Sequence, residues 1–540
     1  MNRKFIDILF SLILISAPFK LVNHCLWLPD FFAAPFAKDF VIWPLLTGIV
    51  YTLYCQWKYG NVFYGWRRFK IFIITYSVIL TISLLQGLVI YPYWDWAFNG
   101  QALNNAKFAL VIDFLGRLGI HIGQDEMLPF WILLSNSKRI LFTAFYTFGG
   151  AYMIFCWYHD RMNRAVSLLK NVTVGFLVVV AAYGLVDMCY QNGQWWAQNF
   201  IAFMWPILHS NTDTSHYPMF FGARNRSLFL EASYYAIYMA FAFPILWWKL
   251  TESKGMMRIG LAALYFILAY EIYLGQSRTA TALFWGELLL MAFVTLYKRK
   301  KKLVVLTLCL MAGATVSFGG AVCFLQYYQV PASLNDRTPL ATKKAKMLMT
   351  QESDKEITEH VEAYIDDSFG SLFDEEKAKK RSGSNRVRLG VTMENIKLGL
   401  KYPIFGVGTG LDTAYMYDVF KEEKNRELKN DFIKRVDEKG LLNKGSPMMC
   451  EYSSRFMQGG LLGLAVFIFP MGYIVWCFLR RLLRRIDDER EFCDILFIAL
   501  ADIGISVAGF GNTVNITYCF WLMLGISYVV ELALRNRERF

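Results

Sequence analysis

The chain has 540 residues, of which 56% are hydrophobic and only 18% are charged. Soluble globular proteins carry about 25% charged residues, so this composition excludes an ordinary water-soluble enzyme. The formal net charge is +13, but the excess of Lys and Arg lies in short connections between apolar runs rather than on one soluble face, which excludes a nucleic-acid-binding protein.

Apolar runs of about 18 residues or more recur along the chain, and each is long enough to cross a hydrocarbon core of about 30 Å. The first run follows Met1-Asn2-Arg3-Lys4 and ends without a small-residue cleavage site, so we expect a retained helix rather than a removed signal. The pattern predicts an all-α polytopic membrane protein with about twelve transmembrane helices. The predicted spans are 5–22, 39–56, 70–92, 139–157, 168–189, 228–248, 257–275, 279–297, 303–326, 455–479, 492–510 and 513–533.

Basic residues concentrate in every second connection, as the positive-inside rule requires of a polytopic membrane protein. With twelve spans, these connections share one side with both termini, so both termini are predicted to be cytoplasmic. The basic stretches lie near 58–70, 161–170, 249–258, 298–302 and 480–485.

The opposite side receives longer connections of mixed charge, at 93–138, 190–227, 276–278 and 327–454. One of them carries an aromatic group that is typical of a helix lying along the membrane surface. A groove for an acceptor substrate is the alternative interpretation. The aromatic residues are Trp195, Trp196, Phe200, Phe203 and Trp205.

The longest connection, 327–454, is predicted to be a mainly helical extracytoplasmic half-domain between the ninth and tenth helices. It divides the chain into parts 1–326, 327–454 and 455–540. Val387, Val391, Ile396 and Leu400 form a helical stripe that stops before Pro403. The glycines at 406–410 predict a tight turn rather than a nucleotide-binding loop, because no strand precedes them and no lysine follows. The charged stretch 340–383 gives no further prediction.

Arginines mark four stretches of this outer side, two of them at the predicted entrances of helices. A guanidinium group has a planar fork that suits phosphate or pyrophosphate oxygens, and a lipid-linked pyrophosphate would lie at this depth. Snorkelling of the side chains to lipid headgroups is the alternative. The candidates are Arg224, Arg226, Arg278, Arg388 and Arg455.

Other polar residues favour different interpretations. The ten cysteines occur singly, so neither a metal site nor a disulfide framework is predicted, and no cofactor is expected. Glu287 and Asp502 lie inside predicted helices, where ionisable groups are often functional, and they support a rival hypothesis of a lipid-linked-sugar transporter. Hydrogen bonding between helices would also explain them.

Four stretches, in order, are similar to motifs of the O-antigen ligase and O-antigen polymerase superfamily. Ser277-Arg278-Thr279-Ala280 resembles its SRxA turn, and RNRSLFLEASYYA, with Arg224 seven residues before Glu231, resembles its arginine-to-Glu-Pro-Ser helix entrance. Arg388 followed by PIFGVGTG resembles the large periplasmic loop, and EYSSRFMQGGLLGL resembles the segment that closes this loop. The resemblance covers roughly residues 215–480.

The resemblance implies a metal-independent glycosyltransferase of the bacterial inner membrane. Such proteins transfer an oligosaccharide from undecaprenyl pyrophosphate to a hydroxyl of a glycan or lipid A-core acceptor at the periplasmic face, and a chain-length regulator protein is a possible partner. It also implies that arginines hold the pyrophosphate and neutralise it as it leaves. Those residues would be Arg224, Arg278 and Arg388, with Arg226 and Arg455 beside them.

One departure from the family pattern favours a polymerase. Ligases of this family usually carry a histidine at the position where Met449 stands here, before Cys450 and Glu451. Glu451 and Glu231 are therefore the candidates to accept the proton of the acceptor hydroxyl. The alternatives are a ligase to lipid A-core or to protein and, in another class, a flippase.

Overall fold

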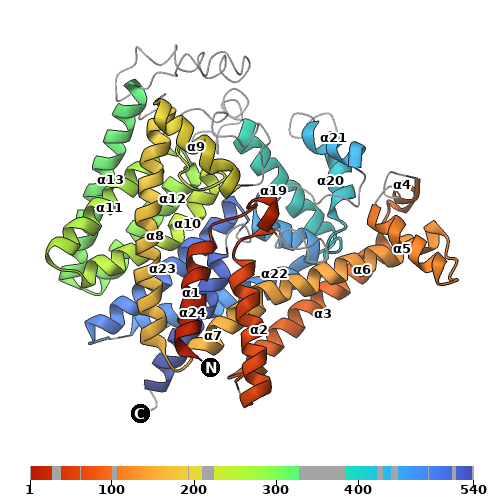
Figure 1. Cartoon of the computed structure of the whole chain (residues 1–540), viewed down its shortest axis with the longest axis horizontal. Helices are drawn as coiled ribbons and strands as arrows, with labels where there is room; N and C mark the ends of the chain where they lie inside the picture. The colour runs from red at the N-terminus through yellow and green to blue at the C-terminus, as the bar shows by residue number, and fades with distance from the viewer. Residues whose placement is uncertain are drawn as a thin grey trace.

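The computed structural model describes eleven ranges of the chain: 2–26, 38–60, 62–99, 106–192, 194–209, 224–327, 383–421, 430–439, 448–484, 486–513 and 518–537. Every regular element within these ranges is a helix, and none of them contains a strand (Figure 1). The predicted all-α class is therefore confirmed for the described residues.

Nine helices of the described ranges are long and apolar enough to cross a membrane, which confirms a multi-pass membrane protein. They comprise α3 (Trp66–Ile90), α6 to α7 (Gln124–Tyr158), α8 (Met162–Gln191), α11 (Gly255–Leu274), α12 (Arg278–Tyr297), α13 (Lys301–Tyr327), α22 (Glu451–Leu483), α23 (Glu489–Gly511) and α24 (Cys519–Arg537).

Helices also occupy the three remaining predicted spans, but they do not meet the same criteria. α1 (Arg3–Ser16) has 14 residues and would be about 21 Å long, which is short of the hydrocarbon thickness. α2 (Ile42–Tyr59) has 18 residues. α10 (Ala232–Glu252) carries three Tyr and two Trp and is buried along nearly its whole length against α8, α12 and α23. The predicted number of twelve thus remains a prediction, with nine positions supported.

The fourth predicted span begins too late. The sequence places it at 139–157, whereas the helix runs from α6 (Gln124–Ala144) through a π-helical turn, η4 (Phe145–Gly149), into α7 (Gly150–Tyr158). Lys138 and Arg139 interrupt the apolar run and suggest a connection, but they lie within the continuous helix.

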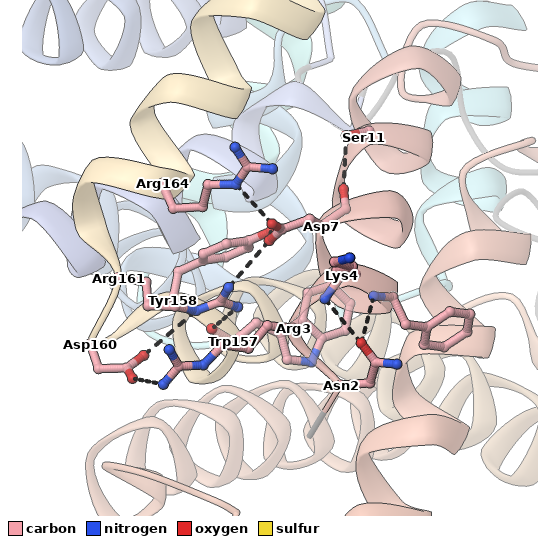
Figure 2. A network of polar contacts seen from close by, with 11 residues as sticks. Asn2, Arg3, Lys4, Asp7, Ser11, Trp157, Tyr158, Asp160, Arg161 and Arg164 are labelled. Carbon is pink, nitrogen blue, oxygen red and sulfur yellow. Dashed lines mark hydrogen bonds and ion pairs between the residues drawn. The ribbon is translucent and has the colours of Figure 1, made fainter.

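The first turns of α1 and the last turns of α24 lie at the same end of the molecule, at the bottom of Figure 1. A polar network anchors α1 there (Figure 2). Asp7 accepts hydrogen bonds from the Tyr158 hydroxyl at 2.9 Å, from Arg161 Nη1 at 3.4 Å and from Arg164 Nε at 2.8 Å. Asp160 pairs with Arg3 at 3.6 Å. The network joins two segments that the charge pattern predicts on one side.

A second contact joins two more of the basic connections. Lys298 Nζ donates to the carbonyl oxygens of Leu483 and Arg484 at 2.8 and 2.9 Å, and Lys300 Nζ donates to that of Ile486 at 3.0 Å. Connections 298–302 and 483–489 therefore lie side by side, as their shared predicted side requires.

The shorter helices lie toward the opposite end, near the top and right of Figure 1. α19 packs along α22, and its extent confirms the predicted helical stripe that stops before Pro403. Residues 328–382, which hold nearly all of the charged stretch, lie outside the described residues. The shorter helices are α4 (Trp94–Asn99), α5 (Ala106–Arg117), α9 (Trp195–Leu208), α19 (Gly383–Lys401), α20 (Asp412–Lys421) and α21 (Asn430–Lys439).

The predicted aromatic helix 195–205 is present as α9. Trp195, Trp196, Phe200 and Phe203 are exposed, as membrane-surface anchoring requires, whereas Trp205 is buried.

Candidate functional site

Helix α22 is interrupted at Gly460, nine residues after its start at Glu451, and two candidate residues lie before this break. Gly460 has φ 63° and ψ −162°, a backbone conformation that is essentially restricted to glycine, so the helix changes direction there. The segment before the break carries Glu451 and Arg455, and the segment after it continues as the transmembrane helix.

The turn after Pro403 packs into this break. The backbone N–H of Val407 donates to the Met457 carbonyl at 2.9 Å, and that of Leu461 donates to the Pro403 carbonyl at 2.8 Å. Because the break leaves helical N–H and C=O groups without their usual partners, these bonds satisfy them. Gly406, Gly408 and Gly410 all have positive φ, of 71°, 100° and 86°. The glycines therefore form a tight turn, as predicted.

Glu451 and Arg455 form a buried ion pair one helical turn apart. Arg455 Nε donates to Glu451 Oε1 at 2.7 Å, and the Glu451 and Arg455 side chains are 1% and 14% exposed. The guanidinium group also donates to the Tyr76 hydroxyl at 3.4 Å and lies 4.9 Å from the centre of the Phe467 ring. The pair holds the Glu451 carboxylate in a fixed orientation next to a cation.

Three candidate segments converge on the C-terminal end of α23. Arg388 Nη1 donates to the Gly511 carbonyl oxygen at 2.7 Å, and the backbone N–H of Glu451 donates to the Asn512 carbonyl at 3.3 Å. A Cβ atom on Gly511 would lie 3.1 Å from Thr279 Oγ1. Since the last carbonyls of a helix lack intrahelical partners and carry partial negative charge, a guanidinium group is a favourable cap for them.

Arg278 is the first residue of α12. Ser277 is the N-cap, and its side chain accepts a hydrogen bond from the Ala280 N–H at 3.4 Å. Arg278 is half-buried. Arg278 therefore lies at the N-terminal end of a helix, where the helix dipole favours anions.

The segment that carries Arg224 lies against the residues that lead to Arg278. The backbone N–H of Asn225 donates to the Leu274 carbonyl at 3.2 Å. Next to it, a Cβ atom on Gly275 would lie 2.9 Å from the Asn225 carbonyl oxygen. The structure thus links the stretch of Arg224 to that of Arg278, and the stretches of Arg278, Arg388 and Glu451 to the C-terminal end of α23.

The two neighbouring arginines differ in their surroundings. Arg224 is exposed, whereas Arg226 is 4% exposed and lies 5.3 Å from the centre of the Trp205 ring. Burial lowers the pKa of the Arg226 guanidinium, and the carboxylate of Asp187 partly offsets this effect. Arg226 therefore belongs to the interior rather than to the surface that a substrate reaches.

Glu231 is the N-cap residue of α10 and is half-buried. Its Oε2 accepts a hydrogen bond from the Ser233 hydroxyl at 3.0 Å. It lies seven residues beyond Arg224 in the chain, on the same entrance to α10.

The sequence did not indicate Tyr76, Asn512 or Asp187, which contact the candidate residues. Tyr76 and Asn512 have no recognisable sequence signal, because each acts through a contact with a distant segment. Asp187 does have a sequence signal, because it is a lone acidic residue near the end of an apolar run, where burial of an ionisable group is costly and often marks a functional residue.

The two intramembrane acids of the transporter hypothesis are buried in the bundle. Asp502 Oδ2 accepts a hydrogen bond from the Ser527 hydroxyl at 2.7 Å, which joins α23 to α24. Glu287 packs against Gly504. Among the described residues, no group of three or more His, Cys, Asp and Glu could hold a metal ion.

Comparison with known proteins adds no assignment. No family model matches the chain, and no curated protein is significantly similar to it.

Proposed function

We propose that this protein is a metal-independent glycosyltransferase of the surface-polysaccharide polymerase type. It transfers an undecaprenyl-pyrophosphate-linked oligosaccharide to an acceptor hydroxyl at the periplasmic face of a bacterial inner membrane. The observation that carries the proposal is the convergence of the Arg224, Arg278 and Arg388 segments with Glu451 at one end of a multi-pass bundle.

In the proposed reaction, the acceptor oxygen attacks the anomeric carbon and the bond from that carbon to the pyrophosphate oxygen breaks. The hydroxyl proton passes to a carboxylate, and undecaprenyl pyrophosphate leaves. The leaving group gains negative charge in the transition state, so fixed guanidinium groups stabilise this state more than the bound substrate. Arg278, at the helix N-terminus, is the residue proposed to act most directly on the pyrophosphate, with Arg224 and Arg388 beside it.

Glu451 is the first candidate for the proton acceptor, because the ion pair with Arg455 holds its carboxylate in one orientation. Glu231, at the entrance of α10, is the second. Arg455 then orients the base rather than the pyrophosphate.

The test is a gel of surface polysaccharide from a deletion strain complemented with single variants. We expect Arg278→Ala, like the deletion, to leave lipid A-core with a single repeat unit, because loss of one transition-state contact costs about 10²- to 10³-fold in rate. Arg258→Ala is the matched control: Arg258 is an exposed arginine near the start of the neighbouring helix α11 and should leave a full ladder.

The other outcomes separate the alternatives. A full-length ladder from Arg278→Ala, at normal protein level, contradicts the role of that residue. Bare core with undecaprenyl-linked chains in the deletion strain identifies a ligase. Lipid-linked units that stay on the cytoplasmic face identify a flippase.

Glu451→Gln tests the proton acceptor separately. Glutamine keeps an oxygen that can accept from Arg455, so we expect a folded protein that transfers no glycan. Wild-type transfer by this variant would show that Glu451 only pairs with Arg455 and is not the proton acceptor. Glu231→Gln would then be expected to abolish the reaction.

A further inference from the structure

We infer that Asp187 is a positioning residue that fixes the Arg224 segment for the lipid-linked pyrophosphate; this inference rests on the proposed function. Asp187 lies in the last turn of α8 and is 3% exposed. Its Oδ2 accepts hydrogen bonds from the backbone N–H groups of Arg226, at 3.0 Å, and of Ser227, at 3.3 Å. Its Oδ1 accepts from Gln191 Nε2 at 3.2 Å.

A carboxylate is needed here because the backbone it holds is unfavourable by itself. Ser227 has φ 51°, in the left-handed region that a non-glycine residue adopts only when its surroundings impose it. Two successive N–H groups that point to one oxygen form an anion-binding concavity, and Asp187 occupies it. The negative charge also balances the buried guanidinium of Arg226.

One face of α8 supplies the remaining contacts. The Asn225 side-chain amide donates to the Gly184 carbonyl at 2.9 Å, and the Ser227 hydroxyl donates to the Val180 carbonyl at 2.6 Å. Residues 180, 184 and 187 are spaced by four and three positions, so they lie on the same side of the helix. The backbone of residues 225–227 is therefore fixed to α8 at three points.

The Arg224 side chain begins directly before this fixed segment and is exposed. Both carboxylate oxygens of Asp187 already accept hydrogen bonds from the protein, so Asp187 acts by fixing the position of Arg224. A misplacement of a binding group by about 1 Å can lower the rate about 10²-fold. A substitution at Asp187 should therefore weaken the contact of Arg224 with the pyrophosphate by moving the Arg224 segment.

The test is a double-mutant cycle on the purified full-length protein in nanodiscs, with the source strain's undecaprenyl-pyrophosphate-linked repeat unit as donor. We expect Asp187→Asn, which keeps the shape but not the charge, to lower kcat/KM about 10-fold, and Asp187→Ala to lower it about 10²-fold. The donor KM should rise while the acceptor KM stays unchanged. A merely structural loss would reduce the active fraction and change neither KM.

The coupling to Arg224 is the decisive result. In the Arg224→Ala background, Asp187→Asn should cause no further loss, because the residue through which it acts is absent. The matched control is Asp502→Asn, a buried carboxyl on α23 that accepts a hydrogen bond from the Ser527 hydroxyl of α24 and, among the described residues, has no contact with the Arg224 segment. Its effect should multiply with that of Arg224→Ala.

The inference would be overturned if the losses in kcat/KM caused by Asp187→Asn and Arg224→Ala multiplied in the double variant. Wild-type kinetics of Asp187→Asn would also overturn it. These results differ from a failure of the proposed function, in which the wild-type protein itself transfers no glycan. If Asp187→Ala does not fold, the isosteric Asp187→Asn carries the test alone.

Discussion

At the scale of single residues, the candidate site contains charged groups at very different depths. Arg224 is exposed, whereas Glu451 and Arg226 are 1% and 4% exposed. A buried charge is costly unless it is paired, and both buried groups face an opposite charge, Arg455 and Asp187 respectively. The exposed side chain of Arg224 is thus accessible from outside, whereas the guanidinium group of Arg226 stays in the interior.

His209 provides a pH-dependent prediction at this scale. It follows α9, is 2% exposed, and its pKa is lowered to about 4, chiefly by burial. At His209 the unfolded chain then binds more protons than the folded one between about pH 4 and pH 6.5, so the contribution of His209 to stability falls as the pH falls through this window. We expect a loss of about 3 kcal/mol across it, which His209→Gln should remove.

Thermal unfolding of the purified protein between pH 7 and pH 4 measures this effect. His121→Gln, the same substitution at an exposed histidine, serves as the control. An unchanged pH dependence in His209→Gln would show that other groups cause it.

Arg224, Arg278 and Arg388 were proposed from the predicted topology and from the motif resemblance, and their role remains a prediction. The structure links the segments of Arg224 and Arg278 to each other, and those of Arg278 and Arg388 to the end of α23. That Arg226 turns inward while Arg224 stays exposed could not be predicted, because the difference depends on Asp187 and Trp205 of other helices. Local sequence contains no information on such distant partners.

At the scale of elements, the break in α22 links the large outer connection to the membrane bundle. The Gly460 backbone requires a glycine, and a Cβ atom there would collide with the Ile404 carbonyl group. We expect Gly460→Ala to lower the free energy of unfolding by about 3 kcal/mol or more, through strain and collision together. It should also lower transfer, because Arg455 and Glu451 lie directly before the break.

Gly472 in the same helix gives the control for this prediction. A Cβ atom at Gly472 would meet Ile468 at an ordinary 3.6 Å, so Gly472→Ala should be neutral or stabilise by up to about 1 kcal/mol. Thermal unfolding of both variants is the measurement. Equal stability of Gly460→Ala and the wild type would mean that α22 tolerates a regular helix at this point.

The hydrophobic pattern predicts some helix boundaries correctly and misses others. The stripe of 387–400 and the stop before Pro403 were predicted correctly, because proline and glycine act locally. The start of α6 at Gln124 was missed, since Lys138 and Arg139 read as a connection although they lie within a continuous helix. Length and hydropathy alone also do not decide whether α1 and α10 span the membrane. α1 has only 14 residues, and α10 is buried against other helices of the protein.

At the scale of the whole molecule, the polar contacts join segments that are predicted to lie on the same side of the membrane. The contacts of Asp7 and of Lys298 join basic connections to one another, while the contacts of Gly511 join the outer segments. This separation supports the proposed orientation, with the basic end in the cytoplasm.

Labelling of introduced cysteines tests this orientation. Lys401→Cys, at the exposed end of α19, should react with a membrane-impermeant maleimide in intact spheroplasts, beyond the background of the unmodified chain. Lys301→Cys, exposed at the start of α13, should react only after the membrane is opened. The reverse pattern would invert the proposed topology, and equal labelling of both would contradict a two-ended arrangement.

The anchoring of α1 by Asp7 has a consequence for biosynthesis. Asp7 is synthesised before its partners Tyr158, Arg161 and Arg164, which follow 151 to 157 residues later in the chain. At about 5–20 residues per second, the carboxylate waits on the order of 10 s or more for them. These contacts of α1 therefore form only after the start of α8 has been synthesised, so α1 is made earlier than the segment that anchors it.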